Sequence, residues 1–278
     1  MRLLTLGNSW TYGIELWDPE LGPQEYYFPL EHSAHDTYRK AHAWPYRFGC
    51  HLDAEVINLG WPSASNDTIS RRLMRWLAGE GYLSGRDAHE LFVVIGWTGL
   101  ERKDFFINDA SIASRFAYVP EQQWITVTPG WGDKHSVKEI ERLSRIYYEH
   151  FCDHGDYLWR YINHVYNAQI TCDRIGARLL QFQAFYENQD FDSYMLLGSL
   201  SDQSHAHLAQ EDVLMWDLVD ASRFYGHKDH SQTFYSWLNV QCDAKGYRRD
   251  QLMMQTHPTA LGHELWADEL LKFSNIHL

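Results

Sequence analysis

Residues 2–13, RLLTLGNSWTYG, decide how the chain begins and which chemistry it can support. The mostly apolar run Arg2–Leu6 predicts a short buried strand, and Gly7 ends it at once. Ser9 follows in a loop that closes on a second glycine, Gly13. A serine in this place is either a turn residue that caps a helix or a nucleophile exposed at the end of a strand. The rest of the sequence has to distinguish between the turn residue and the nucleophile.

Strand and helix signals alternate along the rest of the chain. Strands are predicted at Glu55–Leu59, Leu91–Ile95 and Arg178–Phe182, and the second of these is a continuous apolar run that suits a parallel strand covered on both faces. Helices are predicted over 43–52, from Asn66 or Asp67 onwards, within 137–176, and over Pro258–Phe273. Residues 116–119 and 124–127 predict a hairpin, whereas 186–250 has no regular pattern. The alternation predicts an α/β fold whose parallel sheet carries helices on both faces.

Three of the four predicted strands run into a loop that contains glycine, at residues 7–13, 58–66 and 96–102. In folds of this kind the working site lies beyond the carboxyl ends of the strands, so these loops are expected to converge. A serine can attack an acyl carbon there only if a base takes its proton and donors hold the oxyanion. His257, just before the last predicted helix, is the candidate base.

Two sequence motifs, one around Ser9 and one around His257, resemble conserved motifs (blocks) of the SGNH (GDSL-type) serine hydrolases. That family begins with Gly-Asp-Ser-x-Thr-x-Gly, which is matched here by Gly7, Ser9, Thr11 and Gly13, with Asn8 in place of the aspartate. Its last block, Asp-x-x-His followed by Pro and then Gly-His, is matched by His257, Pro258, Gly262 and His263. Met254 occupies the position of the catalytic aspartate.

The two middle blocks resemble the family more loosely. Asn58 and Gly60 match the second block, but Ser63 stands where an oxyanion-binding glycine is expected. Gly96 matches the third block, with Thr98 in place of the oxyanion-binding asparagine. The resemblance implies one domain over 1–278 with a flavodoxin-like, three-layer α/β/α sandwich and a mainly parallel sheet. Insertions are expected near 14–42, 97–135 and 186–250.

The function that the resemblance implies is cleavage of an acyl ester, such as an O-acetyl group on a sugar. Ser9 is the expected nucleophile and His257 the base. The backbone N–H groups of Ser9 and Ser63 are expected to hold the oxyanion, with the Thr98 hydroxyl or the Asn66 amide as a third donor and Gly60 in the same site. Asn66 has helix capping as an equal alternative, and His263 is expected to be a packed histidine.

Two further expectations concern charged residues near these loops. Because Met254 cannot orient the histidine, either a backbone carbonyl or an aspartate from another loop, Asp250 or Asp243, is expected to take that role. Arg102 directly follows a site loop, and it is a candidate to bind a carboxylate or phosphate of the substrate. The alternative for Arg102 is a solvated surface charge.

Other function classes remain open from the sequence. An acyltransferase would use the same serine and histidine, with an alcohol in place of water. A non-catalytic binding protein would explain why Met254 and Thr98 replace signature residues. A metal-dependent hydrolase would use His205, His207, His227 and His230, although a solvated loop is the favoured reading of those histidines.

Composition limits the partners. The formal net charge of -13 argues against nucleic acid, because an acidic chain repels phosphates. The four cysteines are scattered without a CxxC pair, and neither a signal peptide nor a membrane-spanning run is visible. We therefore expect a soluble cytoplasmic enzyme that acts on a small-molecule or carbohydrate ester, without a metal or an organic cofactor.

Overall fold

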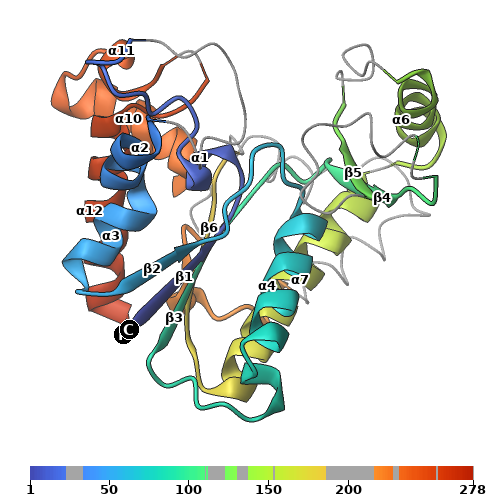
Figure 1. Cartoon of the computed structure of the whole chain (residues 1–278), viewed down its shortest axis with the longest axis horizontal. Coiled ribbons are helices and arrows are strands. Elements are labelled where there is room, and N and C mark those ends of the chain that lie inside the picture. The colour runs from blue at the N-terminus through green and yellow to red at the C-terminus, as the bar shows by residue number, and fades with distance from the viewer. Residues whose placement is uncertain are drawn as a thin grey trace.

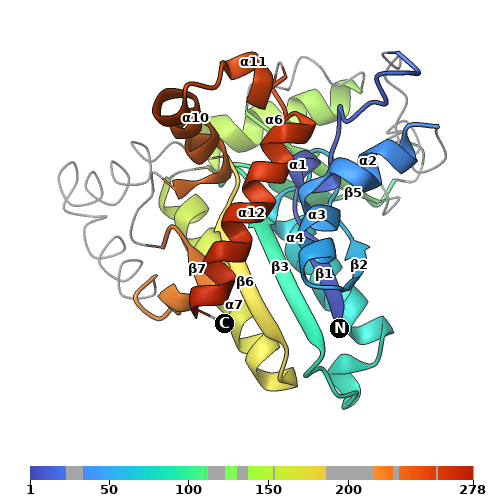
Figure 2. The same ribbon diagram turned by 90° about the vertical axis from the view of Figure 1, so that its left-hand side faces the viewer.

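A five-stranded sheet forms the centre of the computed structural model (Figures 1 and 2). The structure describes residues 1–22, 34–109, 111, 123–129, 137–152, 154–185, 216–227, 232–254 and 256–277. The strands are β1 (Arg2–Leu6), β2 (Glu55–Asn58), β3 (Leu91–Trp97), β6 (Arg178–Gln183) and β7 (Phe224–Tyr225). They lie in the order β2-β1-β3-β6-β7, and every neighbouring pair is parallel.

Helices cover both faces of this sheet (Figure 1). On one side lie α2 (Asp36–His42), α3 (Trp44–His51), α10 (Phe234–Lys245), α11 (Arg249–Leu252) and α12 (Ala260–His277), and on the other α4 (Asn66–Gly79) and α7 (His154–Ile175). Alternate residues of β3 supply the two cores, since Phe92 and Val94 pack in the cluster with α3 and α12, whereas Val93 and Ile95 pack with α4 and α7. The expected three-layer α/β/α architecture with a mainly parallel sheet is confirmed.

A smaller unit projects beside α4 and α7. Strands β4 (Lys103–Phe106) and β5 (Trp124–Val127) pair antiparallel, and α6 (Lys138–His150) packs against them. The strand expected at 124–127 is confirmed, and its partner among the described residues is 103–106; the expected hairpin partner, 116–119, lies outside the described residues. The charged run that contains Lys103 and Asp104 has the composition of a solvated face, which hides the strand.

Other element boundaries also differ from the sequence prediction. The region 186–250 contains β7 and α10, which were not predicted; β7 has only two residues, too few for a periodic signal. Ser65, not Asn66 or Asp67, caps α4, because its side chain accepts from the N–H of Thr68. The last helix begins at Ala260 and not at Pro258, which forms an isolated bridge with Met253.

The four cysteines are all free, and none of the helices in the described ranges is long and apolar enough to cross a membrane.

One buried carboxylate joins the β4–β5 hairpin to the sheet domain. Asp104, 5% exposed, accepts hydrogen bonds from Ser65 Oγ and Thr68 Oγ1 at 2.6 Å and from Thr126 Oγ1 at 2.7 Å. Both terminal nitrogens of Arg71 lie 3.0 Å from the same carboxylate. Asp104 and its partners thus connect α4, β4 and β5, and they fix the position of the hairpin relative to α4.

We predict that Asp104→Ala lowers the free energy of unfolding by about 3–5 kcal/mol, because it leaves the Arg71 guanidinium and three hydroxyls without their acceptor. Asp87→Ala, at an exposed aspartate that pairs with His89, is the matched control and should leave the free energy of unfolding almost unchanged. Urea unfolding measures both values. Equal losses in the two variants would contradict a structural role for Asp104.

Candidate active site

Ser9 stands at the carboxyl end of β1, at the start of the four-residue helix α1 (Ser9–Tyr12). Asn8 caps this helix, since its Oδ1 accepts from the N–H of Trp10 at 2.9 Å. A β-carbon at Gly7 would lie 2.0 Å from Thr11 Oγ1, so the turn closes only on a glycine. The side chain of Ser9 is largely covered, with the residue 8% exposed.

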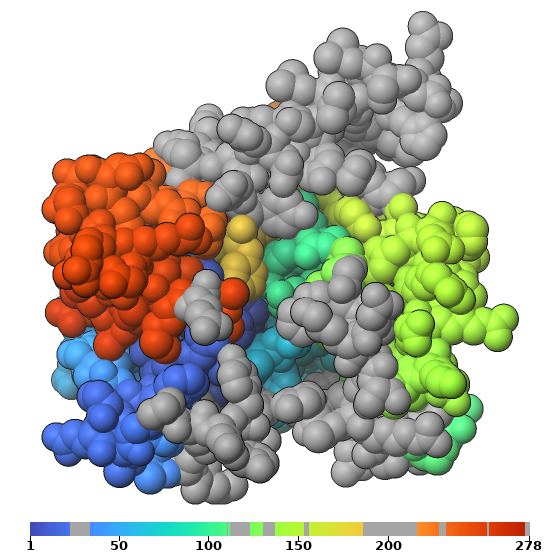
Figure 3. Space-filling model, turned by 90° about the horizontal axis from the view of Figure 1, so that it is seen from above, coloured from blue at the N-terminus to red at the C-terminus, as the bar shows by residue number. Residues whose placement is uncertain are grey.

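His257 reaches this turn from a tight loop before α12. The loop is closed by the Met253–Pro258 bridge and by a hydrogen bond of 2.8 Å from the N–H of Met254 to the carbonyl of His257. The indole N–H of Trp10 donates to the carbonyl of Thr256 at 3.1 Å, which ties the loop to α1. Figure 3 looks down on this end of the molecule, where the N-terminal and C-terminal segments meet.

The two side chains are in hydrogen-bond contact: His257 Nε2 lies 3.0 Å from Ser9 Oγ. On the other side of the ring, Nδ1 lies 3.2 Å from Glu15 Oε1 and 3.0 Å from Thr256 Oγ1. A carboxylate beside Nδ1 favours a proton on that nitrogen, which leaves Nε2 free to accept from the serine hydroxyl. Serine, histidine and carboxylate therefore stand in a continuous line.

Glu15 was not anticipated from the sequence, because it belongs to none of the family's blocks. It is 6% exposed and has a φ of +66°, in the left-handed region that a non-glycine residue rarely adopts. Gly13, with a φ of +84°, ends α1 and turns the chain just before it. The expectation that Asp250 or Asp243 would stand beside His257 is wrong. Both are exposed, and Asp250 pairs with Arg248 at 3.1 Å.

The loop after β2 packs directly on the serine turn. Asn58 holds it there, since its Nδ2 donates to the carbonyl of Thr11 and its Oδ1 accepts from the N–H of Gly60, both at 2.8 Å. A β-carbon at Gly60 would lie 2.6 Å from the backbone nitrogen of Tyr12, so this glycine permits a close approach of two backbones. Ser63, in the same loop, has a φ of +62° and is exposed.

Asn66 and Thr98 contact each other and not the serine. Asn66 Oδ1 accepts from the N–H of Thr98 at 2.9 Å, and its Nδ2 donates to the carbonyl of Thr98 at 3.3 Å. Thr98 is fully buried, and its hydroxyl has no hydrogen-bond partner in the part of the chain that the structure describes. This pair fixes the loop after β3 to the start of α4. Arg102 lies further along that loop, where its Nη1 donates to the carbonyl of Ala64 at 3.0 Å.

His263 lies behind this site as a packed histidine, as expected. It is fully buried on α12, and its Nδ1 accepts from the N–H of Trp44 at 3.3 Å. Burial, and after it the charges of His257 and His42, lowers the pKa of His263 to about 3, so the ring is neutral.

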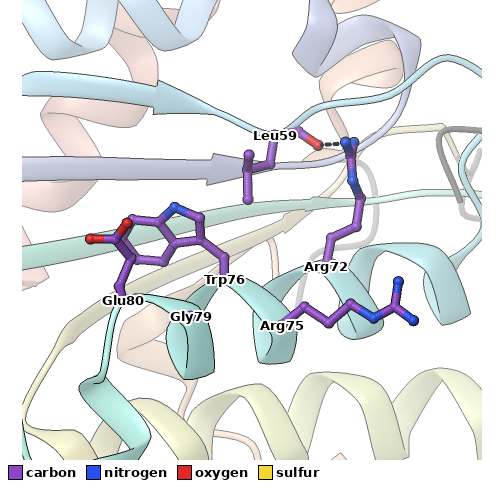
Figure 4. A pocket seen from close by; sticks show the side chains of 6 residues that line it. All are labelled: Leu59, Arg72, Arg75, Trp76, Gly79 and Glu80. Carbon is purple, nitrogen blue, oxygen red and sulfur yellow. Dashed lines mark hydrogen bonds between the residues drawn. The ribbon is translucent and has the colours of Figure 1, made fainter.

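Other candidate sites lie elsewhere. His205, His207 and His230 fall outside the described residues, and within those residues no three potential ligands gather to hold a metal. A pocket of about 360 Å³ opens beside α4 (Figure 4). Its lining contains neither Ser9 nor His257 and consists of Leu59, Arg72, Arg75, Trp76, Gly79 and Glu80.

Comparison with known proteins identifies the family. The model of the "Family of unknown function (DUF6071)" matches residues 30–275, so the chain belongs to that family. The matched region includes His257 and begins after Ser9 and Glu15. No curated protein matches the chain significantly.

Two solved structures are similar over nearly the whole length. An α/β hydrolase enzyme from the metagenome of Lake Arreo, Spain, is 14% identical and covers 100% of this chain and 96% of its own, with a TM-score of 0.41. A protein assigned to the G-D-S-L lipolytic family, from Desulfitobacterium hafniense DCB-2, is 12% identical and covers 98% of both chains, with a TM-score of 0.42. At these TM-scores neither likeness adds to what the sheet itself shows.

We predict that His263 makes stability fall as the pH decreases. Because its folded pKa lies below the ordinary 6.5, the unfolded chain takes up the proton first, so stability is fully present above pH 6.5 and is lost as the pH falls below it. When the pH falls from 7 to 5, the free energy of unfolding should decrease by about 2 kcal/mol more in the wild type than in His263→Gln. Urea unfolding at both pH values, with exposed His89→Gln as control, measures this difference; equal losses in wild type and His263→Gln would contradict it.

Proposed function

We propose that this DUF6071 member is a serine hydrolase of SGNH type that cleaves an acyl ester. The observation that carries the proposal is the line of contacts from Ser9 Oγ to His257 Nε2 and from His257 Nδ1 to Glu15. A nucleophile within hydrogen-bond reach of a base, with the base oriented by a third group, is the arrangement that activates serine for acyl transfer.

Attack begins when the Ser9 hydroxyl gives its proton to His257 Nε2 and its oxygen bonds to the ester carbonyl carbon. The tetrahedral intermediate then collapses, and the alcohol leaves with the proton returned from Nε2. This produces an acyl group on Ser9. Water attacks the acyl-enzyme by the same route in reverse and releases the acid, which restores the free serine.

Glu15 takes the part of the orienting acid. Its carboxylate holds the ring in the tautomer that accepts at Nε2, and it stabilises the imidazolium that forms during attack. The residue is 6% exposed, so little water screens this interaction. The unfavourable φ of +66° fits such a role, since strained backbone persists where the surrounding structure enforces it and clusters at functional sites.

Two backbone N–H groups are the proposed oxyanion donors. Ser9 is the first residue of α1, where an N–H has no partner within the helix. Ser63 lies in the loop that packs on this turn, and no hydrogen bond from its N–H occurs among the described residues. Asn66 and Thr98 support the site by holding its loops. An acyltransferase would use the same residues but transfer the acyl group to an alcohol. Formation of a new ester when an alcohol is added would reveal this activity.

We predict that a fluorophosphonate probe labels Ser9 in the wild type and labels neither Ser9→Ala nor His257→Ala at a comparable rate. The loss in His257→Ala should be at least about 100-fold, because an unactivated serine hydroxyl is a weak nucleophile. Exposed His89→Ala is the matched control and should label like the wild type. Mass spectrometry locates the adduct. Absence of any adduct on folded wild-type protein would favour a non-catalytic binding protein.

We predict that Glu15→Gln lowers kcat/KM for an activated ester by about 100- to 10,000-fold, while exposed Glu20→Gln leaves it unchanged. Glu15→Gly separates catalysis from folding, because it removes the carboxylate but relieves the positive φ. It should lose activity and unfold at no lower urea concentration. Wild-type rates in Glu15→Gln would rule out the orienting role.

A further inference from the structure

Arg102 is a partly buried cation in the loop after β3, next to the candidate site. Its Nη1 donates to the carbonyl of Ala64 at 3.0 Å, and its guanidinium lies 5.5 Å from the centre of the Phe185 ring. A guanidinium over an aromatic face is stabilised by the electrons of the ring. The side chain is therefore held between the loop after β2 and the end of β6.

Both of these neighbours, Ala64 and Phe185, lie next to residues of the candidate site. Ala64 follows Ser63, the proposed oxyanion donor. The ring centre of Phe185 lies 4.7 Å from that of Trp10, the residue after Ser9, in an edge-to-face arrangement. Arg102 thus packs between the loops that follow β2 and β6, each of which lies next to the serine turn.

No carboxylate neutralises this guanidinium within the described ranges. Two other partly buried arginines have acidic partners: Arg71 lies 3.0 Å from Asp104, and Arg160 lies 2.9 Å from Asp156. For Arg102, the only hydrogen bond among the described residues goes to a backbone carbonyl, and its Nε is buried without a partner. Burial lowers its pKa, and the charge of Glu101 only partly offsets this.

A partly buried charge of this kind is costly, because it loses water and no carboxylate of the described ranges replaces it. A ligand that carries a negative charge can supply the missing counter-ion. The geometry points to the substrate: we infer that Arg102 binds a carboxylate carried by the ester, so that the enzyme prefers anionic esters over neutral ones. This inference rests on the proposed function of Ser9 and His257.

A planar carboxylate fits a guanidinium, which can offer two parallel N–H donors to its two oxygens. Nη1 is already used by Ala64, and Nη2 donates no hydrogen bond within the described part of the chain. The carboxylate can lie on the acyl side or on the alcohol side of the ester bond. The two positions require different substrates in the test.

The test compares kcat/KM for matched esters. The acyl-side pair is the para-nitrophenyl monoester of succinic acid against para-nitrophenyl butyrate. The alcohol-side pair is para-acetoxybenzoate against its neutral methyl ester. The anionic-to-neutral ratio in the wild type is divided by the same ratio in Arg102→Gln, so the intrinsic reactivity of each ester cancels.

The matched control is Arg72→Gln. Arg72 makes the same kinds of contact as Arg102, since its Nη1 donates to the carbonyl of Leu59 at 2.7 Å and its guanidinium lies 5.0 Å from the Trp61 ring. It lines the pocket beside α4, and that lining includes neither Ala64 nor Phe185, the two neighbours of Arg102 (Figure 4). Arg72→Gln should keep the wild-type ratio.

For one of the two pairs, we expect Arg102→Gln to lower the anionic-to-neutral ratio by at least about tenfold, the usual effect of losing a hydrogen bond to a charged group. In the wild type, the same ratio should fall as salt is raised from about 0.05 to about 0.5 M. The salt series needs no variant, so it applies even if Arg102→Gln does not fold.

Two failures are distinguishable. Wild-type hydrolysis with a ratio that neither Arg102→Gln nor salt changes, for both pairs, overturns the role of Arg102 and leaves the hydrolase standing. No hydrolysis of any of the esters, together with no fluorophosphonate adduct on Ser9, overturns the proposed function and this inference with it.

Discussion

The contact of 3.0 Å between Ser9 Oγ and His257 Nε2 joins residues 248 positions apart, and the candidate site depends on it. Neither residue could reach the other without the parallel sheet, which brings the end of β1 and the loop before α12 to the same edge. The indole of Trp10 reinforces the contact through its hydrogen bond to Thr256. The same indole packs against Phe234 in the core, so the position of the site follows from the packing of the domain.

The carboxylate beside His257 comes from an unexpected part of the chain. In the family that the sequence resembles, the acid lies three residues before the histidine, where this chain has Met254. Here Glu15 lies six residues after the proposed nucleophile, so α1 and the loop that follows it supply a side chain to each ring nitrogen of His257, Ser9 to Nε2 and Glu15 to Nδ1. The left-handed conformation of Glu15 lowers stability, which is the kind of cost that functional sites carry.

The sequence predicted four of the five strands of the sheet, because each of them begins or ends at a clear break in an apolar run. It also predicted that Ser9 and His257 would meet, since both lie next to elements whose ends converge. It missed β4 because Asp104 gives that segment a polar composition, whereas inside the fold this charge is buried among hydroxyls and Arg71.

Glu15 could not be predicted for a different physical reason. Its side chain faces His257 only because Gly13 and Glu15 itself adopt positive φ values, and a glutamate gives no sign of such a conformation in a sequence. The environment of Arg102 was equally hidden. The sequence showed a cation after a site loop, but the Phe185 ring above it and the lack of a partner for its Nε among the described residues are features of tertiary packing.

The central claim is that Ser9 becomes acylated during turnover, and it can be observed directly. The protein is mixed with an excess of a para-nitrophenyl ester, quenched in acid within the first turnovers and digested, and the peptide that contains Ser9 is weighed by mass spectrometry. We expect that peptide to carry one acyl group, in an amount that matches the initial burst of para-nitrophenol. Ester hydrolysis without any acyl group on Ser9 would contradict the account, because the reaction would then proceed through another group.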